Sequence, residues 1–422
     1  MSKSNSCEMF ISSLKGKRVL VVGLGLQGGG VGVARFFSRH GSLVTVTDTK
    51  SHGELSDSIT ALKDQSNITY HLGGHHNEDF LNTDLIIKGP SVRWDNPYIL
   101  KALQVGIPVT METALFVKYA GCKTIGITGT RGKSTTTNLI FQTLSQLYKK
   151  GKVYMSGNVP GTCAIELLDT VKDNDLAVLE LSSWQLSGFH HEKISPNIAL
   201  FTNLYPDHLN YYLGMTEYEH DKNAIAQYQQ KGDVYIDGRK MSSVNHHEHN
   251  KSCAKAVCIA VLGDSSSVAV DSAISSVSGL PMRQEIISIF DDITVINDST
   301  STTPIALQTA LKSYVDKPVI LIMGGNAKKL PLADLITEIT SARQIKKIFF
   351  MPGTFTDEIH VSIQGTLISD FEQLIKSATQ YAQELNQPCY LLFSPGATSF
   401  AQFKNEFDRG NRFNKLISDI IK

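Results

Sequence analysis

The chain has 422 residues, and at about 150 residues per domain this length predicts about three domains. Lysine and arginine together number 40, as do aspartate and glutamate, so the formal net charge is zero. This balance excludes a strongly basic nucleic-acid-binding protein and gives no indication of an acidic membrane partner.

Cysteine usage and the N-terminal sequence indicate the compartment. The six cysteines form no Cys-x-x-Cys pair, which favours reduced thiols over a disulfide framework. Residues 1–10 lack the charged-then-apolar pattern of a signal peptide, and no apolar run reaches about 18 residues. We therefore expect a cytoplasmic protein with no membrane insertion.

The first predicted unit is a strand, a glycine-rich turn, a helix and a second strand. The strand over 17–22 ends in the G-x-G-x-x-G turn Gly23–Gly28, the helix covers 32–40, and the second strand ends at Asp48. This order is typical of a dinucleotide-binding βαβ unit. NAD and a UDP-sugar are both candidate ligands, and a structural turn without a ligand stays open.

Alternation of strands and helices continues through the N-terminal domain, which we predict to cover residues 1–111. Extended segments over 68–70, 85–87 and 107–110 and a helix over 98–105 complete it.

A second glycine-rich loop opens the central domain, predicted over residues 112–280. The apolar strand 125–128 runs into Gly129-x-x-Gly132-Lys133-Ser134, and a helical pattern follows. Backbone N–H groups of such a loop and the helix dipole suit triphosphate oxygens. Lys133 would neutralise the β- and γ-phosphates and Ser134 would ligate Mg²⁺, so the loop predicts an ATP site. An ordinary strand-to-helix turn with a surface lysine is the alternative.

Three more polar residues follow predicted strands of the central domain. Glu180 ends the strand 177–179, a natural place for a Mg²⁺ ligand or for a solvated acid. His208 lies just past a strand over 197–201, where a histidine is more often packed or solvated than a ligand. Lys222 falls on a predicted helix over 216–229 and could point back to the same site.

Two histidine clusters could suggest metal sites. His71, His75 and His76 form one, and His246, His247 and His249 form the other. We expect all of them to be loop residues without a metal, because no strand or helix frame fixes their geometry.

The third domain, predicted over residues 281–422, again alternates strands and helices. Strands are expected over 293–296, 319–323, 347–351 and 389–393, and a helix over 305–311. This pattern predicts a parallel sheet with its polar loops at one edge.

Six segments in this order resemble the Mur ligase family over nearly the whole chain. They are 129–135, 180–186, 203–208, 297–299, 324–328 and 394–410. The resemblance implies an α/β fold with three domains: a Rossmann-like UDP-binding domain, a central P-loop ATPase domain with a parallel sheet, and a Rossmann-like C-terminal domain. It also implies an ADP-forming amide ligase of peptidoglycan precursor synthesis, most similar to members that join D-glutamate to UDP-N-acetylmuramoyl-L-alanine. A monomer is expected.

Matching the family's motifs position by position assigns the site residues. ATP binding falls to Gly129, Thr130, Arg131, Gly132, Lys133, Ser134, Thr135, Asn250, Arg283 and Asp298. Substrate binding falls to Leu26, Gln27, Asp48, Thr49, Lys50, Asn158, Lys328, Ser399 and Phe400. Two Mg²⁺ ions would be held by Ser134, Glu180, His208 and a carbamylated Lys222, and the catalytic set is Lys133, Glu180, His208 and Lys222.

Some positions depart from the family pattern. Cys253 stands where an asparagine near the adenine is expected, and the segment between Lys222 and Asn250 is short. An L-glutamate-adding ligase and a folylpolyglutamate synthase are neighbouring alternatives, although the latter lacks the first domain. A nucleotide sensor or an NAD-dependent oxidoreductase built on Gly23–Gly28 is the alternative from another class.

Overall fold

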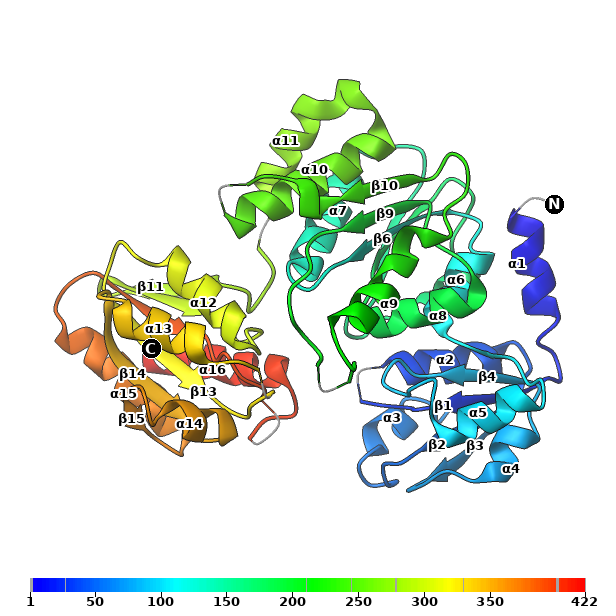
Figure 1. The fold of residues 1–422 in the computed structure, drawn as a ribbon, viewed down its shortest axis with the longest axis horizontal. Helices are drawn as coiled ribbons and strands as arrows, with labels where there is room; N and C mark the ends of the chain where they lie inside the picture. The colour runs from blue at the N-terminus through cyan, green and yellow to red at the C-terminus, as the bar shows by residue number, and fades with distance from the viewer. Residues whose placement is uncertain are drawn as a thin grey trace. The chain divides into compact units, whose positions relative to one another are not determined.

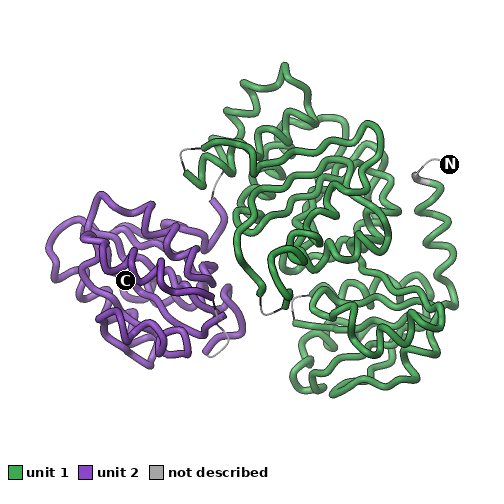
Figure 2. The backbone as a smooth tube through the Cα atoms, viewed as in Figure 1, with its two compact units in different colours: residues 1–277 green, residues 278–422 purple. Residues whose placement is uncertain are grey.

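The computed structural model describes residues 3–26, 28–209, 211–243, 245–277, 279–328, 330–399 and 402–421. The strands in these ranges form three sheets (Figure 1). The chain divides into two compact units, residues 1–277 with two sheets and residues 278–422 with the third (Figure 2). The predicted α/β class is confirmed, and the domain boundaries after residues 111 and 280 stay predictions.

The first sheet is parallel throughout, in the order β3-β2-β1-β4-β5. Its strands are β1 (Arg18–Val22), β2 (Leu43–Asp48), β3 (Ile68–Leu72), β4 (Leu85–Lys88) and β5 (Val109–Thr110). Helix α1 (Lys3–Ser12) precedes this sheet in the chain, and the helices that connect its strands are α2 (Gly29–Arg39), α3 (Ser56–Thr60), α4 (Asn77–Leu81) and α5 (Pro97–Gln104). The strand order reverses between β1 and β4, and ligands of open α/β sheets bind at such a point, beyond the carboxyl ends of the strands.

The second sheet belongs to the same unit and is also parallel, in the order β10-β9-β6-β8-β7. Its strands are β6 (Lys123–Thr128), β7 (Val153–Gly157), β8 (Leu176–Glu180), β9 (Ile198–Phe201) and β10 (Val234–Asp237). The helices are α6 (Glu112–Tyr119), α7 (Lys133–Leu147), α8 (Ser183–Glu192), α9 (Met215–Gln227), α10 (His246–Leu262) and α11 (Ser267–Ser276). Central β6 is buried beyond its first residue and carries Ile125 and Ile127, as expected of a strand covered on both faces.

Helix α8 shows how the motif after Glu180 fixes local structure. Ser182 Oγ accepts a hydrogen bond from the Gln185 backbone N–H at 3.2 Å, and Gln185 Oε1 accepts one from the Ser182 N–H at 3.0 Å. This capping box satisfies two backbone donors at the start of the helix. The helix therefore begins directly after the end of β8, and Trp184 lies in its first turn.

The sheet of the second unit has the order β11-β12-β16-β13-β14-β15. Its strands are β11 (Glu285–Phe290), β12 (Ile293–Asn297), β13 (Val319–Gly324), β14 (Ile345–Met351), β15 (Thr366–Leu367) and β16 (Cys389–Phe393). The helices are α12 (Pro304–Ser313), α13 (Ala333–Ser341), α14 (Thr354–Ile359), α15 (Phe371–Glu384) and α16 (Glu406–Ile421).

The prediction of an entirely parallel third sheet is wrong at its edge. Strand β11 pairs antiparallel with β12, whereas the other pairs are parallel. Asp291 and Asp292 join these two strands with φ of +47° and +63°. Two consecutive positive φ angles suit the twist of a tight hairpin, but Asp-Asp lacks the glycine that usually signals one.

The prediction that the histidine clusters lie in loops is also wrong for four of the six residues. His246, His247 and His249 lie on α10, and His71 lies on β3. Helix α10 begins there because the Asn245 side chain accepts a hydrogen bond from the Glu248 N–H at 2.9 Å.

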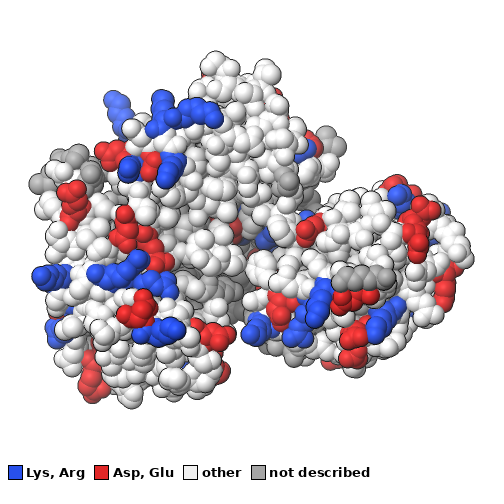
Figure 3. All heavy atoms as spheres, turned by 180° about the vertical axis from the view of Figure 1, so that it is seen from behind, with Lys and Arg blue, Asp and Glu red and all other residues white. Residues whose placement is uncertain are grey.

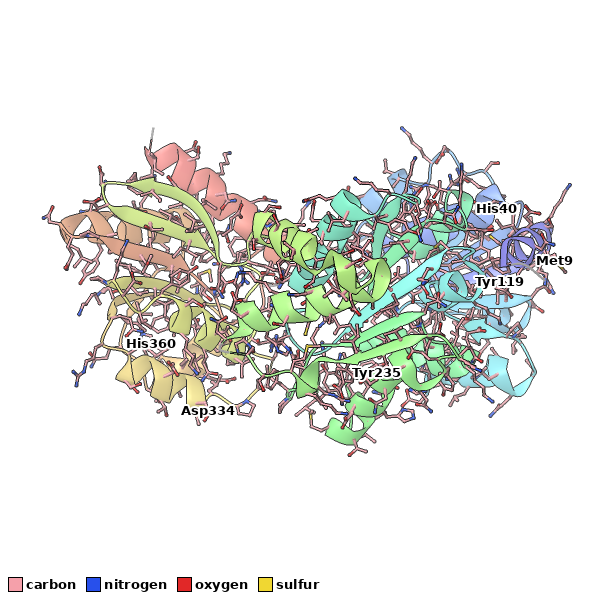
Figure 4. The ribbon with its side chains drawn as sticks, turned by 90° about the horizontal axis from the view of Figure 1, so that it is seen from above. Met9, His40, Tyr119, Tyr235, Asp334 and His360 are labelled. Carbon is pink, nitrogen blue, oxygen red and sulfur yellow. The ribbon has the colours of Figure 1, made fainter. Side chains whose placement is uncertain are left out.

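The N-terminal helix packs on the second sheet's helical layer. Phe10 of α1 stacks on Tyr119 at the end of α6, with ring centroids 4.1 Å apart. Met9 and Tyr119 are labelled in Figure 4, where α1 lies close to the end of α6. The helix is thus fixed to the first unit by an aromatic contact.

Surface charge and helix hydropathy agree with the composition. On the face drawn in Figure 3, basic and acidic side chains are interspersed on both units. Within the described ranges, no helix combines the length and apolar character that crossing a bilayer requires. No disulfide joins the six cysteines, all of which lie in the described part of the chain.

Candidate active site

The loop between β6 and α7 is shaped by two glycines. Gly132 is the N-cap of α7 with φ of +76°, and Gly129 has φ of +144°. A Cβ on Gly132 would collide with the Asn250 side chain, and one on Gly129 would collide with Thr202 Oγ1. Glycine is therefore needed for both conformation and close approach. The contact also brings Asn250, predicted from sequence to bind ATP, against the phosphate loop.

Asn203 holds the phosphate loop from the end of β9. Its Oδ1 accepts a hydrogen bond from the Arg131 N–H at 2.8 Å, and its Nδ2 donates to the Arg131 carbonyl at 3.0 Å. Its carbonyl oxygen accepts from the Thr130 N–H at 2.9 Å. Asn203 lies in a segment quoted for the family resemblance, but sequence reasoning assigned it no role. Only the structure identifies it as the clamp on this loop.

Two lysines meet at one carbonyl oxygen of this loop. Nζ of Lys133 and Nζ of Lys222 both donate to the Gly129 carbonyl, at 3.0 Å and 2.9 Å. Lys222 is only 1% exposed, and this burial lowers its pKa well below the usual value. The positive charge of Lys133 lowers that pKa further, while nearby carboxylates oppose the shift. The sequence indicated that Lys222 could point back to the site of Glu180 and His208. In the structure its Nζ reaches the phosphate loop, and its catalytic and metal-binding roles stay predictions.

Glu180 is buried beside the same sheet edge rather than solvated. It ends β8 with 3% of its surface exposed, and its Oε1 accepts a hydrogen bond from Asn158 Nδ2 at 2.9 Å. The Asn158 N–H donates to the Glu180 carbonyl at 2.8 Å. The pairing of β7 with β8 and of β8 with β6 therefore brings the predicted Asn158 and Glu180 to the edge that carries the phosphate loop.

His208 lies on the loop that follows β9. It has φ of +54°, and its ring centroid is 5.0 Å from that of Trp184. Its neighbour Asp207 is buried, and Asp207 Oδ2 lies 3.9 Å from Arg131 Nη2. Sequence reasoning missed Asp207 as a partner of the phosphate loop, although it is adjacent to His208 in the chain. Asp207 thus approaches the phosphate loop at Arg131, and the His208 ring packs beside Trp184.

The glycine-rich turn of the first sheet is braced by Asp48. Its Oδ2 accepts hydrogen bonds from the Leu24 and Gly25 N–H groups at 2.9 Å and 3.2 Å, and its Oδ1 accepts from the Lys50 N–H at 2.9 Å. Both oxygens are engaged by the protein backbone. The carboxylate therefore orders the turn, and its assignment to substrate binding stays a prediction.

The turn also adjoins the Asn158 loop. A Cβ on Gly28 would lie 3.6 Å from the Cα of Gly161. Two regions predicted to contact substrate are therefore neighbours in the first unit. Leu26 and Thr49 are exposed and Lys50 is half-buried beside this turn, whereas Gln27 lies outside the described residues.

The second unit carries the remaining predicted residues. Asp298 follows β12, and its two oxygens accept hydrogen bonds from Ser394 Oγ at 2.7 Å and from the Gln284 N–H at 3.1 Å. Burial raises the pKa of Asp298 to about 7, although the positive charge of Arg283 opposes the shift. Arg283 thus lies within electrostatic reach of Asp298, and the assignment of both residues to ATP stays a prediction.

Lys328 and Ser399 follow β13 and β16 at the carboxyl ends of these strands. Lys328 Nζ donates to Thr302 Oγ1 at 3.2 Å. Ser399 is 4% exposed, and its buried Oγ has no hydrogen-bond partner among the described residues. Phe400, the third residue assigned to the amino acid, lies outside the described residues.

Arg409, on α16, connects the loop after β12 with the loop after β16. Fully buried, it donates to Ser299 Oγ at 3.2 Å, to the Ser299 carbonyl at 2.7 Å and to the Ala397 carbonyl at 3.1 Å. Burial lowers the pKa of Arg409 to about 10. The run 394–410 carries part of the family resemblance, but the matched motif gives Arg409 no role. A buried arginine that binds three backbone or hydroxyl oxygens fixes the loops after β12 and β16 relative to each other.

Comparison with known proteins identifies the family. The sequence model of the Mur ligase MurD-like N-terminal domain matches residues 17–111, and that of the Mur ligase middle domain matches residues 127–279. A UDP-N-acetylmuramoylalanine–D-glutamate ligase of Borreliella burgdorferi is 30% identical over 462 residues, covering 98% of this chain and 100% of that protein. The chain belongs to the Mur ligase family. A ligase of the same name from Roseiflexus is also 30% identical, covering 96% of this chain and 99% of its own length.

Solved Mur ligases share the fold at lower identity. UDP-N-acetylmuramate–alanine ligase MurC of Thermotoga maritima is 18% identical with a TM-score of 0.58, covering 96% of this chain and 100% of its own. The MurF ligase of the same organism, solved in complex with ADP, is 13% identical with a TM-score of 0.56 and covers 96% of each chain. These likenesses confirm the Mur ligase fold of the present chain.

Proposed function

We propose that this chain is an ATP-dependent, ADP-forming amide ligase that adds D-glutamate to UDP-N-acetylmuramoyl-L-alanine in peptidoglycan precursor synthesis. The observation that carries the proposal is the meeting of Lys133 and Lys222 at the Gly129 carbonyl, beside buried Glu180, in a Mur ligase chain. Relatives that match this chain almost end to end and bear the D-glutamate ligase name support the choice of amino acid.

The donor set suits Mg²⁺ and a triphosphate. Ser134 at the start of α7 and the buried carboxylate of Glu180 supply oxygen ligands, which Mg²⁺ prefers, and His208 is assigned as a further ligand. When bound, Mg²⁺ supplies positive charge that screens the γ-phosphate and the substrate carboxylate from each other. Lys133 adds a fixed positive charge where the loop approaches the phosphates.

The reaction then requires positioning rather than an enzyme nucleophile. The substrate carboxylate attacks the γ-phosphorus, ADP leaves, and an acyl phosphate forms. The amine of glutamate attacks the acyl carbon, and the tetrahedral intermediate expels phosphate. Asn158 would orient the acceptor, Asn250, Arg283 and Asp298 the nucleotide, and Lys328 and Ser399 the amino acid. The other assigned residues keep the roles that the family resemblance gives them.

We also propose that Lys222 is carbamylated in the active enzyme. Two ammonium groups on one carbonyl oxygen repel each other, and the burial of Lys222 adds a desolvation cost. In carbamylation the neutral amine forms an N–C bond to CO₂ and releases a proton. The product is an anion that faces Lys133 and offers oxygen atoms to a second Mg²⁺.

Product analysis tests the proposal. The full chain is incubated with ATP, Mg²⁺, UDP-N-acetylmuramoyl-L-alanine and either enantiomer of glutamate, and the product is identified by mass spectrometry. We expect product and phosphate with D-glutamate, and neither with Lys133→Ala. Formation of product with L-glutamate and not with D-glutamate would show that the L enantiomer is the substrate. Unchanged phosphate release by Lys133→Ala would refute the role of the phosphate loop. Tight NADH binding, measured by fluorescence, would instead favour an oxidoreductase.

A further inference from the structure

Two histidines and an aspartate converge on the packed pair α8 and α9, away from the assigned histidine His208. His190 lies near the end of α8, and His220 and Asp221 lie in the middle of α9. Ligand atoms of these three side chains all lie within 4.8 Å of one another. The cluster differs from both histidine clusters that the sequence draws attention to, because its members are 30 residues apart in the chain.

A tyrosine hydroxyl orients each of the two partly buried members. Tyr228 Oη lies 2.8 Å from His190 Nδ1, which leaves Nε2 directed at residue 220, 2.8 Å from its carbonyl oxygen. Tyr212 Oη donates to Asp221 Oδ2 at 3.0 Å, while Oδ1 lies 3.6 Å from His220 Nδ1. In this structure His190 Nε2 therefore donates to the residue-220 carbonyl, whereas Asp221 Oδ1 is turned towards the His220 ring.

His220 is the exposed member of the set. Its side chain is 63% exposed, and its ring stacks on that of His190 with centroids 4.2 Å apart. Zinc–nitrogen bonds are about 2.0–2.1 Å long, so the ligand atoms must approach one another more closely than 4.8 Å. This requires rotation of the exposed His220 imidazole and a turn of the His190 ring away from the residue-220 carbonyl.

We propose that His190, His220 and Asp221 form a binding site for a late first-row divalent metal such as Zn²⁺. Two imidazoles and one carboxylate with water as the fourth ligand make a familiar tetrahedral zinc set, whereas Mg²⁺ prefers oxygen ligands. In the metal-bound form the His190 proton lies on Nδ1 and is donated to Tyr228 Oη. The Nε2 lone pair becomes available to the ion when the His190 ring turns away from the residue-220 carbonyl, which then loses its hydrogen bond from Nε2.

Zinc titration of the full chain tests the site. The protein is dialysed against a chelator, and Zn²⁺ alone is then added in competition with a chromophoric chelator, without nucleotide or Mg²⁺. We expect one Zn²⁺ per parent chain, loss of this binding in His220→Ala, and affinity lowered about 10–100-fold in Tyr228→Phe. His71→Ala is the matched control, since His71 is a partly exposed histidine paired with Asp79, and it should bind like the parent.

Thermal unfolding distinguishes loss of the metal site from misfolding of the variant. Without metal, His220→Ala should unfold at the temperature of the parent, because the side chain is largely exposed, and Zn²⁺ should raise the midpoint of the parent alone. Stoichiometric binding retained by His220→Ala, lost in His71→Ala, or absent from the parent would overturn the proposal. None of these measurements depends on ligase activity.

Discussion

Replacing Asn203 with alanine removes the side-chain clamp on the phosphate loop. Two hydrogen bonds are lost, one from the Arg131 N–H and one to the Arg131 carbonyl. At about 1 kcal/mol each, the loop conformation loses about 2 kcal/mol of stabilisation. If ATP must restore this conformation, its affinity falls about 30-fold, since 1.4 kcal/mol corresponds to a factor of ten.

Isothermal titration of ATP into parent and variant measures the effect. Asn197→Ala is the matched control, because Asn197 makes comparable hydrogen bonds to Thr124 and Asp233 at the opposite end of the sheet. Both variants should lose stability in urea, but only Asn203→Ala should lose ATP affinity. An ATP affinity within about twofold of the parent, or an equal loss in both variants, would refute the clamp.

Two further predictions concern buried ionisable groups. Lys222→Ala should lower kcat by about 10²–10³, and added short carboxylic acids should partly restore it by replacing the carbamate; full activity without an additive would exclude the carbamate. Burial raises the pKa of Asp298 from 3.8 to about 7, so its contribution to stability is complete below about 3.8 and is lost as the pH rises through about 7. Asp298→Asn keeps hydrogen-bond partners for Ser394 and Gln284. As the pH rises from about 3.8 to about 7, the free energy of unfolding of the variant, measured in urea, should therefore rise by up to about 4 kcal/mol relative to that of the parent. A constant difference between the two proteins across these pH values would contradict the assignment.

The phosphate loop and the strand–helix alternation could be predicted from sequence because their signals are local. Gly129, Gly132, Lys133 and Ser134 are nearly contiguous, and a loop between a buried strand and a helix has few conformations available. The same applies to Glu180, since a carboxylate that directly ends a buried strand must lie at the sheet edge. For these residues the chain order already implies the position.

Features that depend on hydrogen bonding between distant segments required the tertiary structure. Lys222 reaches the Gly129 carbonyl across 93 residues, and Asn203 reaches Arg131 across 72. Such contacts depend on which strands are neighbours and on their register, which a local pattern does not specify. The antiparallel β11 was missed for a related reason, because its Asp-Asp turn carries no glycine signal.

The α/β fold and the phosphate loop that ends in lysine and serine follow from neighbouring residues, because periodicity and loop chemistry are properties of adjacent positions. Three features appear only when the chain is folded: two lysines share one carbonyl oxygen, Asp48 braces its own glycine turn, and His190 stacks on His220. Packing of helices and sheets brings such pairs together. The energy of that packing comes from contacts throughout the core, so no single segment of the sequence specifies it.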